Sequence, residues 1–365
     1  MLAAVLFVLF FSGCAAMPFF GLPAAKEVYP VPGFPTPYHD YKGILHVHSH
    51  YSSSATGSFE EIADAAREAG ANFVVMTDHN TLAPLRDKKE GLYGSVLVLV
   101  GTEVTDNEGG HIELLGVDQD TDLKKSSNEI LDEVGKQEGA AFVCHADFPR
   151  SPWTDRPLTS RLTGMEIYNL GVMIMEQNLF WTGMKSVFYP RKYFIRSLLK
   201  RPDGLLAEWD KILEKQNFVG VAGADAHARF RVLGMPVDSY SMMFKIVQTH
   251  VLARDFSEGS LVEAFRKGHS YVGFDAVKPV GNFLFMADTS KKRAVMGDRI
   301  KYRDDLKLRV FLPEEAEIRV LKDGKLWMSA TGKDWSATAE GKGVYRVEVY
   351  DKGKLWILSN PIYVV

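Results

Sequence analysis

Cysteine is scarce in this 365-residue chain, which contains only Cys14 and Cys144. A framework of several disulfides is therefore excluded, and Cys144, within the apolar run AAFVCHADF, is interpreted as a small buried hydrophobe. The chain also lacks an excess of positive charge, with 43 basic and 46 acidic residues and a formal net charge of -3. Its positive residues form no single long run, which argues against DNA or RNA as a bulk partner.

The N-terminal segment lacks the length of a membrane-spanning helix. Its apolar run, MLAAVLFVLFFSGCAAM, closes on small residues as a secretory signal does. FSGC resembles a bacterial lipobox, in which Cys14 is lipidated. We therefore predict a signal peptide with lipobox over 1–17 and a Pro-rich tether over 18–42, which together indicate an exported, lipid-anchored protein of the bacterial cell envelope, periplasmic or at the cell surface. A plain secretory leader or an uncleaved anchor is the alternative.

From residue 43 onward, short apolar runs alternate with amphipathic helical patterns. In GSFEEIADAAREAG, Ser58 and Glu61 have capping-box spacing and Gly70 marks the stop. Further helices are predicted at SNEILDEVGKQE and DGLLAEWDKILEKQ. Strand-like runs recur at NFVVMTDHN, SVLVLVGTEVT, HIELLG, AAFVCHA, GMEIYN and FVGVAGADAH. This order predicts an α/β fold of parallel strands covered by helices, either a barrel or a doubly wound sheet.

Side chains of the kinds that bind metals fall at the ends of these strand-like runs. In parallel α/β folds, functional residues gather at the carboxyl ends of the strands. Histidine and carboxylate side chains are the ligands that Zn, Mn and Fe use. The residues at the exits of the runs are His46, His48, Asp78, His79, Glu103, His145, Asp225 and His227, while His111 lies at the start of its run.

The stretch LHVHSHYS contains a third histidine, His50. If this stretch is extended, His46, His48 and His50 point to the same face. His50 would then lie one step beyond His48, which suits a substrate contact or a proton donor better than a metal ligand. A solvated histidine at the rim of the site is the alternative.

The ordered motifs resemble those of the PHP superfamily, the polymerase and histidinol phosphatase domain. They are LHVHSHYS, MTDHN, GTEVT, HIELLG, FVCHAD and GADAH, over roughly residues 43–275. The arrangement is most similar to secreted PHP metallohydrolases with a C-terminal β module. The resemblance implies a distorted (β/α)7 barrel over 43–277, two or three divalent metal ions (Mn, Zn or Fe) and hydrolysis of phosphoesters.

The resemblance also implies which residues bind the metals. Glu103 corresponds to the carboxylate that bridges two ions, and His111 is expected to complete the position of a third. The other implied ligands are His46, His48, His79, His145, Asp225 and His227. Where many trinuclear members carry a further histidine or aspartate, this chain has the serines of YSSSATG, so a weak or absent third metal is expected.

The implied ligand set predicts a mechanism. Two cations would share a hydroxide and hold the phosphoryl oxygens. Asp78 is expected to orient His79 or to accept a proton, and His227 or His50 to protonate the leaving group. For Asp78, a turn-capping carboxylate is the alternative.

Recognition of the substrate is expected to involve arginine. Arg150 and Arg229 lie just past implied ligands, where a guanidinium can hold a phosphate or a carboxylate. Ordinary surface arginines are the alternative. A basic and aromatic insertion near 170–203 has three interpretations: a lid over the site, a contact with anionic lipid, or a packed helical insertion.

The pattern changes after residue 278. Polar and apolar residues alternate over 278–365, and Asp323-Gly324 is a hairpin signal, so we predict a small antiparallel β-sandwich. This segment contains no histidine and is assigned no catalytic role.

The function predicted from the sequence is a metal-dependent hydrolase, first of all a phosphoesterase, that acts on a small phosphorylated molecule. No protein partner is indicated. Because a metal hydroxide does not itself require phosphorus, hydrolysis of another ester, an amide or a carbamate is one alternative. A non-catalytic, metal-containing surface lipoprotein that binds a ligand or partner is the other.

Overall fold

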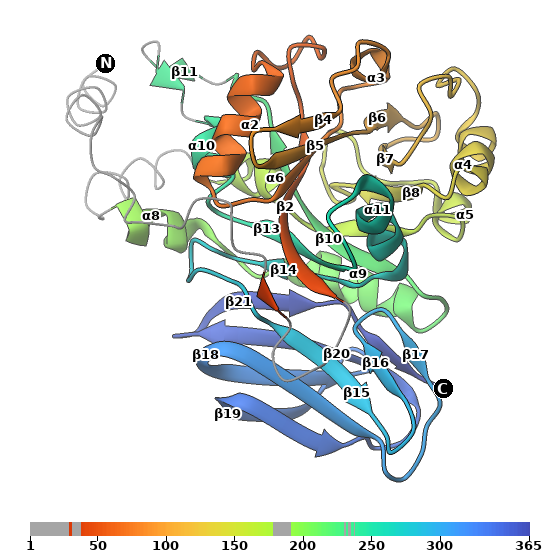
Figure 1. Ribbon diagram of the computed structural model, residues 1–365, viewed down its shortest axis with the longest axis vertical. Helices are drawn as coiled ribbons and strands as arrows, with labels where there is room; N and C mark the ends of the chain where they lie inside the picture. The colour runs from red at the N-terminus through yellow and green to blue at the C-terminus, as the bar shows by residue number, and fades with distance from the viewer. Residues whose placement is uncertain (1–28, 31–37, 178–190, 230, 233–234, 237) are drawn as a thin grey trace.

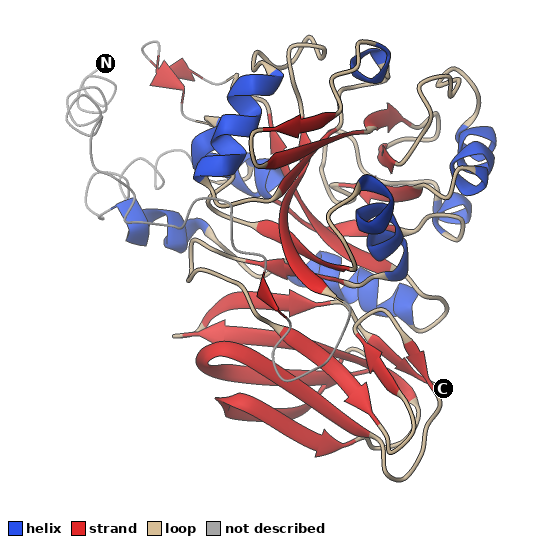
Figure 2. Cartoon of the chain, viewed as in Figure 1, coloured by secondary structure: helices blue, strands red, loops and turns tan. Residues whose placement is uncertain are grey.

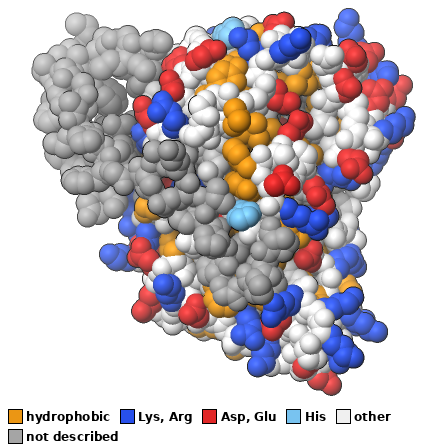
Figure 3. Space-filling view, viewed as in Figure 1, with side chains coloured by type: hydrophobic (Ala, Val, Ile, Leu, Met, Phe, Trp, Pro, Cys, Tyr) orange, Lys and Arg blue, Asp and Glu red, His pale blue; other side chains and the backbone are white. Residues whose placement is uncertain are grey.

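The computed structural model describes residues 29–30, 38–177, 191–229, 231–232, 235–236 and 238–365. The predicted signal peptide and Cys14 lie outside these residues. Within them, no helix is both long enough and apolar enough to cross a membrane. In Figure 1, an α/β part, coloured from orange to teal, packs on a set of long strands coloured blue. Figure 2 shows the helices and strands of the two parts in the same view. On the face shown in Figure 3, basic and acidic side chains are interspersed.

The strands of the α/β part carry the sequence motifs. They are β1 (Tyr29–Pro30), β2 (His39–Val47), β3 (Phe73–Met76), β4 (Gly91–Tyr93), β5 (Val96–Val100), β6 (Thr102–Thr105), β7 (His111–Leu115), β8 (Ala140–Cys144), β9 (Gly164–Asn169), β10 (Val219–Ala226), β11 (Arg231–Val232), β12 (Met235–Pro236), β13 (Gln248–Ala253) and β14 (Ser270–Gly273). The helices are α2 (Phe59–Glu68), α3 (Ala83–Arg86), α4 (Ser127–Lys136), α5 (Arg156–Thr159), α6 (Leu170–Met175), α8 (Arg191–Leu198), α9 (Asp203–Leu213), α10 (Tyr240–Met243) and α11 (Glu258–Lys267).

Side-chain caps fix the residues at which two of the predicted helices begin. Ser58 Oγ accepts a hydrogen bond from the Glu61 N–H at 3.1 Å and so caps α2. A reciprocal capping box between Ser126 and Glu129 begins α4. In α2, the apolar side chains at helical spacing are buried, which holds this helix against the sheet.

In the α/β part, the series of paired strands begins at β2 and comes back to β2. Strand β2 is parallel to β3, β3 is parallel to β5, and the chain passes through Gly101 from β5 into β6. Strands β6, β7 and β8 pair antiparallel in turn. Strands β8, β9, β10 and again β2 are parallel. The mixed α/β sheet therefore brings the ends of all these strands around one centre.

The expectation of uniformly parallel strands is wrong at β7. No helix is present between β6 and β7, and the short connection leaves them antiparallel, with Glu103 opposite Glu113. The reversal places the start of β7 beside the end of β8, with His111 paired to Cys144.

Strand β2 begins at His39, inside the predicted tether, so the boundary at residue 43 lies too late in the chain. Its first half pairs with β13, from His39 opposite Ala253 to Gly43 opposite Thr249. The buried Asp40 accepts a hydrogen bond from the Tyr271 hydroxyl at 2.6 Å, which ties this early segment into the core.

The C-terminal strands continue the same sheet. They are β15 (Leu284–Asp288), β16 (Arg293–Val295), β17 (Arg299–Ile300), β18 (Lys307–Lys322), β19 (Lys325–Thr338), β20 (Gly343–Asp351), β21 (Lys354–Ser359) and β22 (Ile362–Val364). Strand β14 pairs antiparallel with β21, so the two parts share backbone hydrogen bonds. The predicted turn joins β18 to β19, with φ of 51° at Asp323 and 74° at Gly324, as a type I′ hairpin requires.

A buried charge network also joins the two parts. The guanidinium of Arg346 on β20 donates to both carboxylate oxygens of Asp210 on α9 at 2.7 and 2.8 Å, and to Glu348 at 2.7 Å. Arg201 donates to Glu348 at 2.6 Å. Burial alone would raise the pKa of Glu348, but the hydrogen bond from Arg201 and the charge of Arg346 outweigh it and lower this pKa to about 2.

Part of the basic and aromatic insertion lies outside the described residues, which leave out 178–190. Near its end, Arg196 on α8 donates to the Asp351 carboxylate at 2.9 Å. This described portion of the insertion therefore contacts the C-terminal strands, as a packed segment does.

Candidate metal centre

The centre begins at an irregularity in β2. The register between β2 and β3 shifts between Ile44 and Val47, and His46 has a φ of 60°, in the left-handed region. The extended stretch expected to run through His50 is wrong, because β2 ends at Val47. His46 and His48 are both fully buried, and their rings lie 5.1 Å apart. The bulge, not a simple alternation of side chains, brings these two histidines together.

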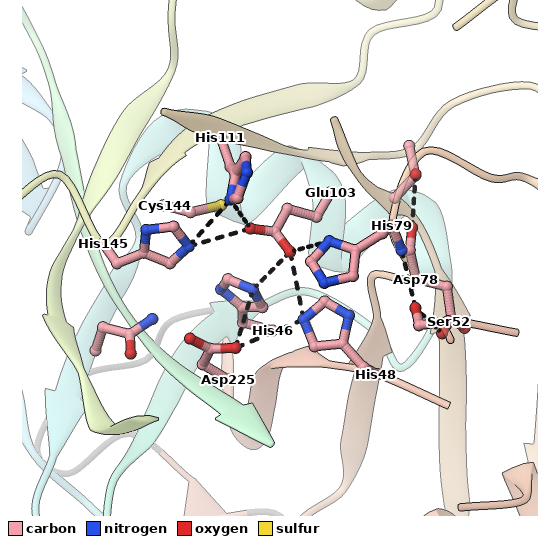
Figure 4. A network of polar contacts seen from close by, with 12 residues as sticks. His46, His48, Ser52, Asp78, His79, Glu103, His111, Cys144, His145 and Asp225 are labelled. Carbon is pink, nitrogen blue, oxygen red and sulfur yellow. Dashed lines mark hydrogen bonds and ion pairs between the residues drawn. The ribbon is translucent and has the colours of Figure 1, made fainter. Parts of the chain in front are cut away.

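Two more strand-end residues have the same unusual backbone. His145, just after β8, has a φ of 29°, and Asp225 near the end of β10 has a φ of 50°. Residues other than glycine rarely adopt positive φ, and the cost is of order 1–3 kcal/mol each. Such strain persists where the surrounding structure holds it. In Figure 4, His46 and His145 are both directed at Glu103, and Asp225 is directed at His46.

Glu103, on β6, lies in the middle of this group (Figure 4). One carboxylate oxygen, Oε1, is 2.7 Å from His111 Nδ1 and 3.1 Å from His145 Nε2. The other oxygen, Oε2, is 2.9 Å from His79 Nδ1 and 3.3 Å from the Nε2 atoms of His46 and His48. The two oxygens of a single carboxylate thus face two different sets of imidazoles.

The electrostatics keep Glu103 ionised. Complete burial would raise the pKa of its carboxyl, but His46, His111 and His145 outweigh burial and hold this pKa well below its usual range. Asp225 is affected in the same direction, because the charge of His46 and the nearby His48 ring, whose Nε2 is 3.6 Å from Asp225 Oδ1, outweigh burial and lower its pKa. The centre therefore presents two buried carboxylate anions among neutral or positive rings.

Within the described residues, the potential ligand atoms gather into overlapping groups whose atoms all lie within 4.8 Å of one another. The groups are His46, His48 and Asp225; Glu103, His111 and His145; His48, His79 and His227; His46, Glu103 and Cys144; and His46, Glu113 and Glu166.

Several buried polar atoms of the centre have no hydrogen-bond partner among the residues that the structure describes. They include His46 Nε2, both ring nitrogens of His48, His145 Nδ1 and Glu103 Oε2. An unpaired buried polar atom costs about 1–3 kcal/mol, and coordination to a cation removes that cost. Imidazole nitrogen and carboxylate oxygen are donors that Zn, Mn and Fe accept. The residues of this centre therefore fit divalent cations.

Comparison with known proteins finds a family that is similar to part of this chain. Residues 45–144 match the model of the PHP domain. The match covers the segment from β2 to β8 that supplies His46, His48, His79, Glu103 and His111. No curated protein matches the chain.

Solved structures give weaker likenesses. A two-domain protein from Bacteroides vulgatus ATCC 8482 that contains a predicted PHP-like metal-dependent phosphoesterase has a TM-score of 0.49 and 14% identity, and the match covers 93% of this chain and 100% of that one. PsfC from Pseudomonas syringae PB-5123 has a TM-score of 0.41 and 13% identity, over 64% and 91%. An endonuclease Q in complex with a 27-mer duplex that carries an abasic lesion has a TM-score of 0.38 and 14% identity, over 63% and 56%. At these values the likenesses define neither the activity nor the partners of this chain.

Within the matched residues, the position of His111 follows from the direction of its strand. Because β7 runs antiparallel to β8, the first residue of β7 lies at the edge where β8 ends. His111 Nδ1 is 3.4 Å from His145 Nε2, so the two rings face the same oxygen of Glu103. His111 therefore belongs with Glu103 and His145, whereas the separate group of three imidazoles consists of His48, His79 and His227.

Asp78 is buried but faces the serine loop. Its carboxylate accepts hydrogen bonds from the Ser49 N–H at 2.8 Å and from the Ser49 and Ser52 hydroxyls, both at 2.6 Å. Ser52 Oγ in turn accepts from the His79 N–H at 3.0 Å. These bonds are those of a turn-capping carboxylate, and they reach His79 through its backbone, not its ring.

Three predicted site residues lie outside the ligand groups in the described part of the chain. The side chains of His50, Arg150 and Arg229 are exposed. His50 Nδ1 is 3.1 Å from the Gly57 carbonyl oxygen. The Arg229 N–H donates to Asp238 at 3.1 Å, which orders its backbone but leaves its guanidinium at the surface.

Two buried carboxyls were not among the predicted site residues. Glu166 on β9 and Glu113 on β7 are fully buried, and both group with His46. The only signal in the sequence is an acidic residue inside an apolar strand, in GMEIYN and HIELLG. Cys144 is also fully buried, and burial raises the pKa of its thiol well above the usual value, so the thiol stays neutral.

Proposed function

We propose that this protein is a metal-dependent hydrolase, first of all a phosphoesterase. In this proposal a distorted (β/α)7 barrel over residues 43–277, with β2 reaching back to His39, precedes a β-sandwich over residues 278–365. One observation carries the proposal: the two oxygens of Glu103 face separate sets of imidazoles, as a carboxylate shared by two cations requires.

The residues that would hold the cations follow from the groups of neighbouring ligand atoms in the metal centre. His46, His48 and Asp225 would share one ion with Glu103, and His111 and His145 a second. A third position would use His79 and His227 together with His48. Manganese, zinc and iron are the proposed metals. When bound, such cations neutralise developing charge on the substrate and lower the pKa of an attacking water.

The protein's own side chains would position these groups and move protons. The side chain of His227 is 21% exposed and its ring stacks on that of His48 at 4.1 Å, so it lies where the buried centre meets solvent. It can therefore hand a proton to a leaving group that departs outward. Asp78 would act by holding Ser52, and through it the backbone of His79. Arg150 and Arg229 are proposed to contact the substrate.

The proposal is tested by elemental analysis of protein purified without added metal, together with a substrate panel. At least two transition-metal ions per chain and turnover of phosphoesters are expected. Carboxylic esters, amides and carbamates in the same panel separate the alternative hydrolases. Active protein with only a trace of metal would contradict the metal mechanism, and metal-loaded protein inert on the whole panel would favour a non-catalytic lipoprotein.

A substitution separates His50 from the ligands. Because its ring is exposed and lies outside the ligand groups, His50→Ala is expected to keep its metal. If His50 donates a proton, turnover falls by roughly 10²–10⁴-fold. Metal content and kcat measured on the same preparation decide between the roles: an unchanged kcat identifies a rim histidine, and metal loss equal to that of His48→Ala makes His50 a ligand.

We also propose that the protein is exported and held at the bacterial membrane by lipid on Cys14. Mature protein is then expected to begin at Cys14, to carry a lipid mass and to fractionate with membranes, while Cys14→Ala abolishes all three. Intact-mass analysis checks this directly. A mature chain that starts at another residue without a lipid overturns the proposal.

A further inference from the structure

Glu166 contacts two histidines of the centre. It is fully buried on β9. Its Oε1 lies 2.7 Å from His46 Nδ1, and its Oε2 accepts a hydrogen bond from the His145 N–H at 2.6 Å. The Asn169 amide donates to the same Oε2 at 2.9 Å. A single buried carboxylate is therefore bonded to residues from both groups that share Glu103.

The contact with His46 determines which ring nitrogen carries the proton. His46 Nε2 is directed at the ligand carboxylates, 3.3 Å from Glu103 and 3.7 Å from Asp225. Nδ1 must then carry the proton and donate it to Glu166, because a nitrogen that binds a cation needs its lone pair. A carboxylate behind the imidazole also fixes the plane of the ring and makes Nε2 a stronger donor.

The contact with His145 holds a strained backbone. His145 has a φ of 29°, which its side chain disfavours, and its N–H is bonded to Glu166 instead of to a neighbouring strand. The position of the Glu166 carboxylate depends on Gly223. A Cβ at Gly223 would lie 1.6 Å from Glu166 Oε1, so only glycine leaves room for this carboxylate beside His46.

We propose that Glu166 is a positioning residue that organises both metal groups at once, through the ring of His46 and the backbone of His145. This inference rests on the proposed function, since it concerns the same centre. Asn169 supports Glu166, because its amide nitrogen bonds Glu166 while its Oδ1 accepts from the Val172 N–H at 2.9 Å and caps α6.

The test compares Glu166→Gln with a matched control. Glutamine keeps one acceptor but presents an NH₂ group to either His46 or the His145 N–H, so one of the two bonds must fail. Asp40→Asn is the control, because Asp40 is a buried carboxylate on β2 that accepts a hydrogen bond from the Tyr271 hydroxyl and lies outside the ligand groups of the described residues.

The first readout is zinc affinity from competition with a chelator, with circular dichroism to confirm folding. Glu166→Gln is expected to bind zinc about 10–100-fold more weakly than the wild type, the range found for outer partners of ligand histidines. Asp40→Asn is expected to bind like the wild type. Wild-type affinity in folded Glu166→Gln overturns the inference, and equal weakening in both variants overturns it too. A wild type that binds no zinc contradicts the proposed function instead.

The second readout does not depend on the variant folding. In zinc-loaded wild type, the ¹⁵N resonances of His46 are expected to show a protonated Nδ1 and a coordinated Nε2. A proton on Nε2, or coordination through Nδ1, overturns the inference.

Discussion

Replacing Glu103 with alanine is expected to remove most of the metal from the purified protein and to lower turnover by roughly 10³-fold or more. Cations contribute several kcal/mol of charge stabilisation to such reactions, and about 1.36 kcal/mol corresponds to a factor of ten. Because its two oxygens face separate sets of histidines, Glu103 is the residue whose loss affects both groups. The measurement is metal content by mass spectrometry together with kcat.

Asp40→Ala is the informative control for Glu103→Ala. Asp40 is a buried carboxylate on β2, the strand that leads to His46, and lies outside the ligand groups of the described residues. If the loss of any buried carboxylate were enough to lower the metal content, both variants would lose metal alike. Retention of a full metal complement by folded Glu103→Ala would falsify the assignment of Glu103 as a shared ligand.

Replacing Arg346 with alanine is expected to destabilise the protein by about 3–5 kcal/mol, the cost of breaking a buried ion pair from one side. The side chain of Arg346 is 1% exposed, and its removal takes a charged partner from Glu348, which is 3% exposed, and from Asp210, which is 15% exposed. Arg319→Ala on β18 is the matched control, because that arginine is 39% exposed and its ion pair is with Glu317, two residues away, although its guanidinium also lies 4.2 Å from the centre of the Tyr350 ring. We expect the control to cost less than about 1 kcal/mol. Urea denaturation measures both.

The same network predicts an effect of acid. The pKa of Glu348 is lowered to about 2 in the folded protein, below its value in an unfolded chain. Its contribution is therefore complete above the unfolded pKa and is lost as the pH falls toward 2. In Arg346→Ala this loss between about pH 4 and pH 2 should shrink. Equal denaturation midpoints for Arg346→Ala and Arg319→Ala at neutral pH would show that the network does not join the two parts.

Much of the centre could be predicted because ligands occupy recognisable positions in the chain. His46, His48, His79, Glu103 and His145 each follow or end an apolar run, and local periodicity identifies such runs. The carboxyl ends of neighbouring parallel strands meet, so residues far apart in sequence are expected together. Capping residues and the Asp323-Gly324 turn act over a few residues, and for this reason the structure confirms them.

The tertiary structure decided what depends on partners distant in the chain. The direction of β7 is set by its pairing with β8, and this direction determines that His111 joins His145. The bulge at His46 arises from a register shift against β3 and β10, which no local pattern encodes. His50 was grouped with its neighbours on the assumption that one extended strand runs through all three histidines, but β2 ends at Val47.

The sequence by itself therefore determined which side chains could bind metals, their order along the chain and the helices and turns that local hydrogen bonds define. Only the tertiary structure decided the directions of these side chains, the contacts of Glu166 with His46 and His145, and the continuity of β14 with β21. The physical reason is the range of the interactions. A cap or a hairpin turn involves neighbouring residues, whereas a strand register, a buried carboxylate or an interface depends on which distant segments pack together.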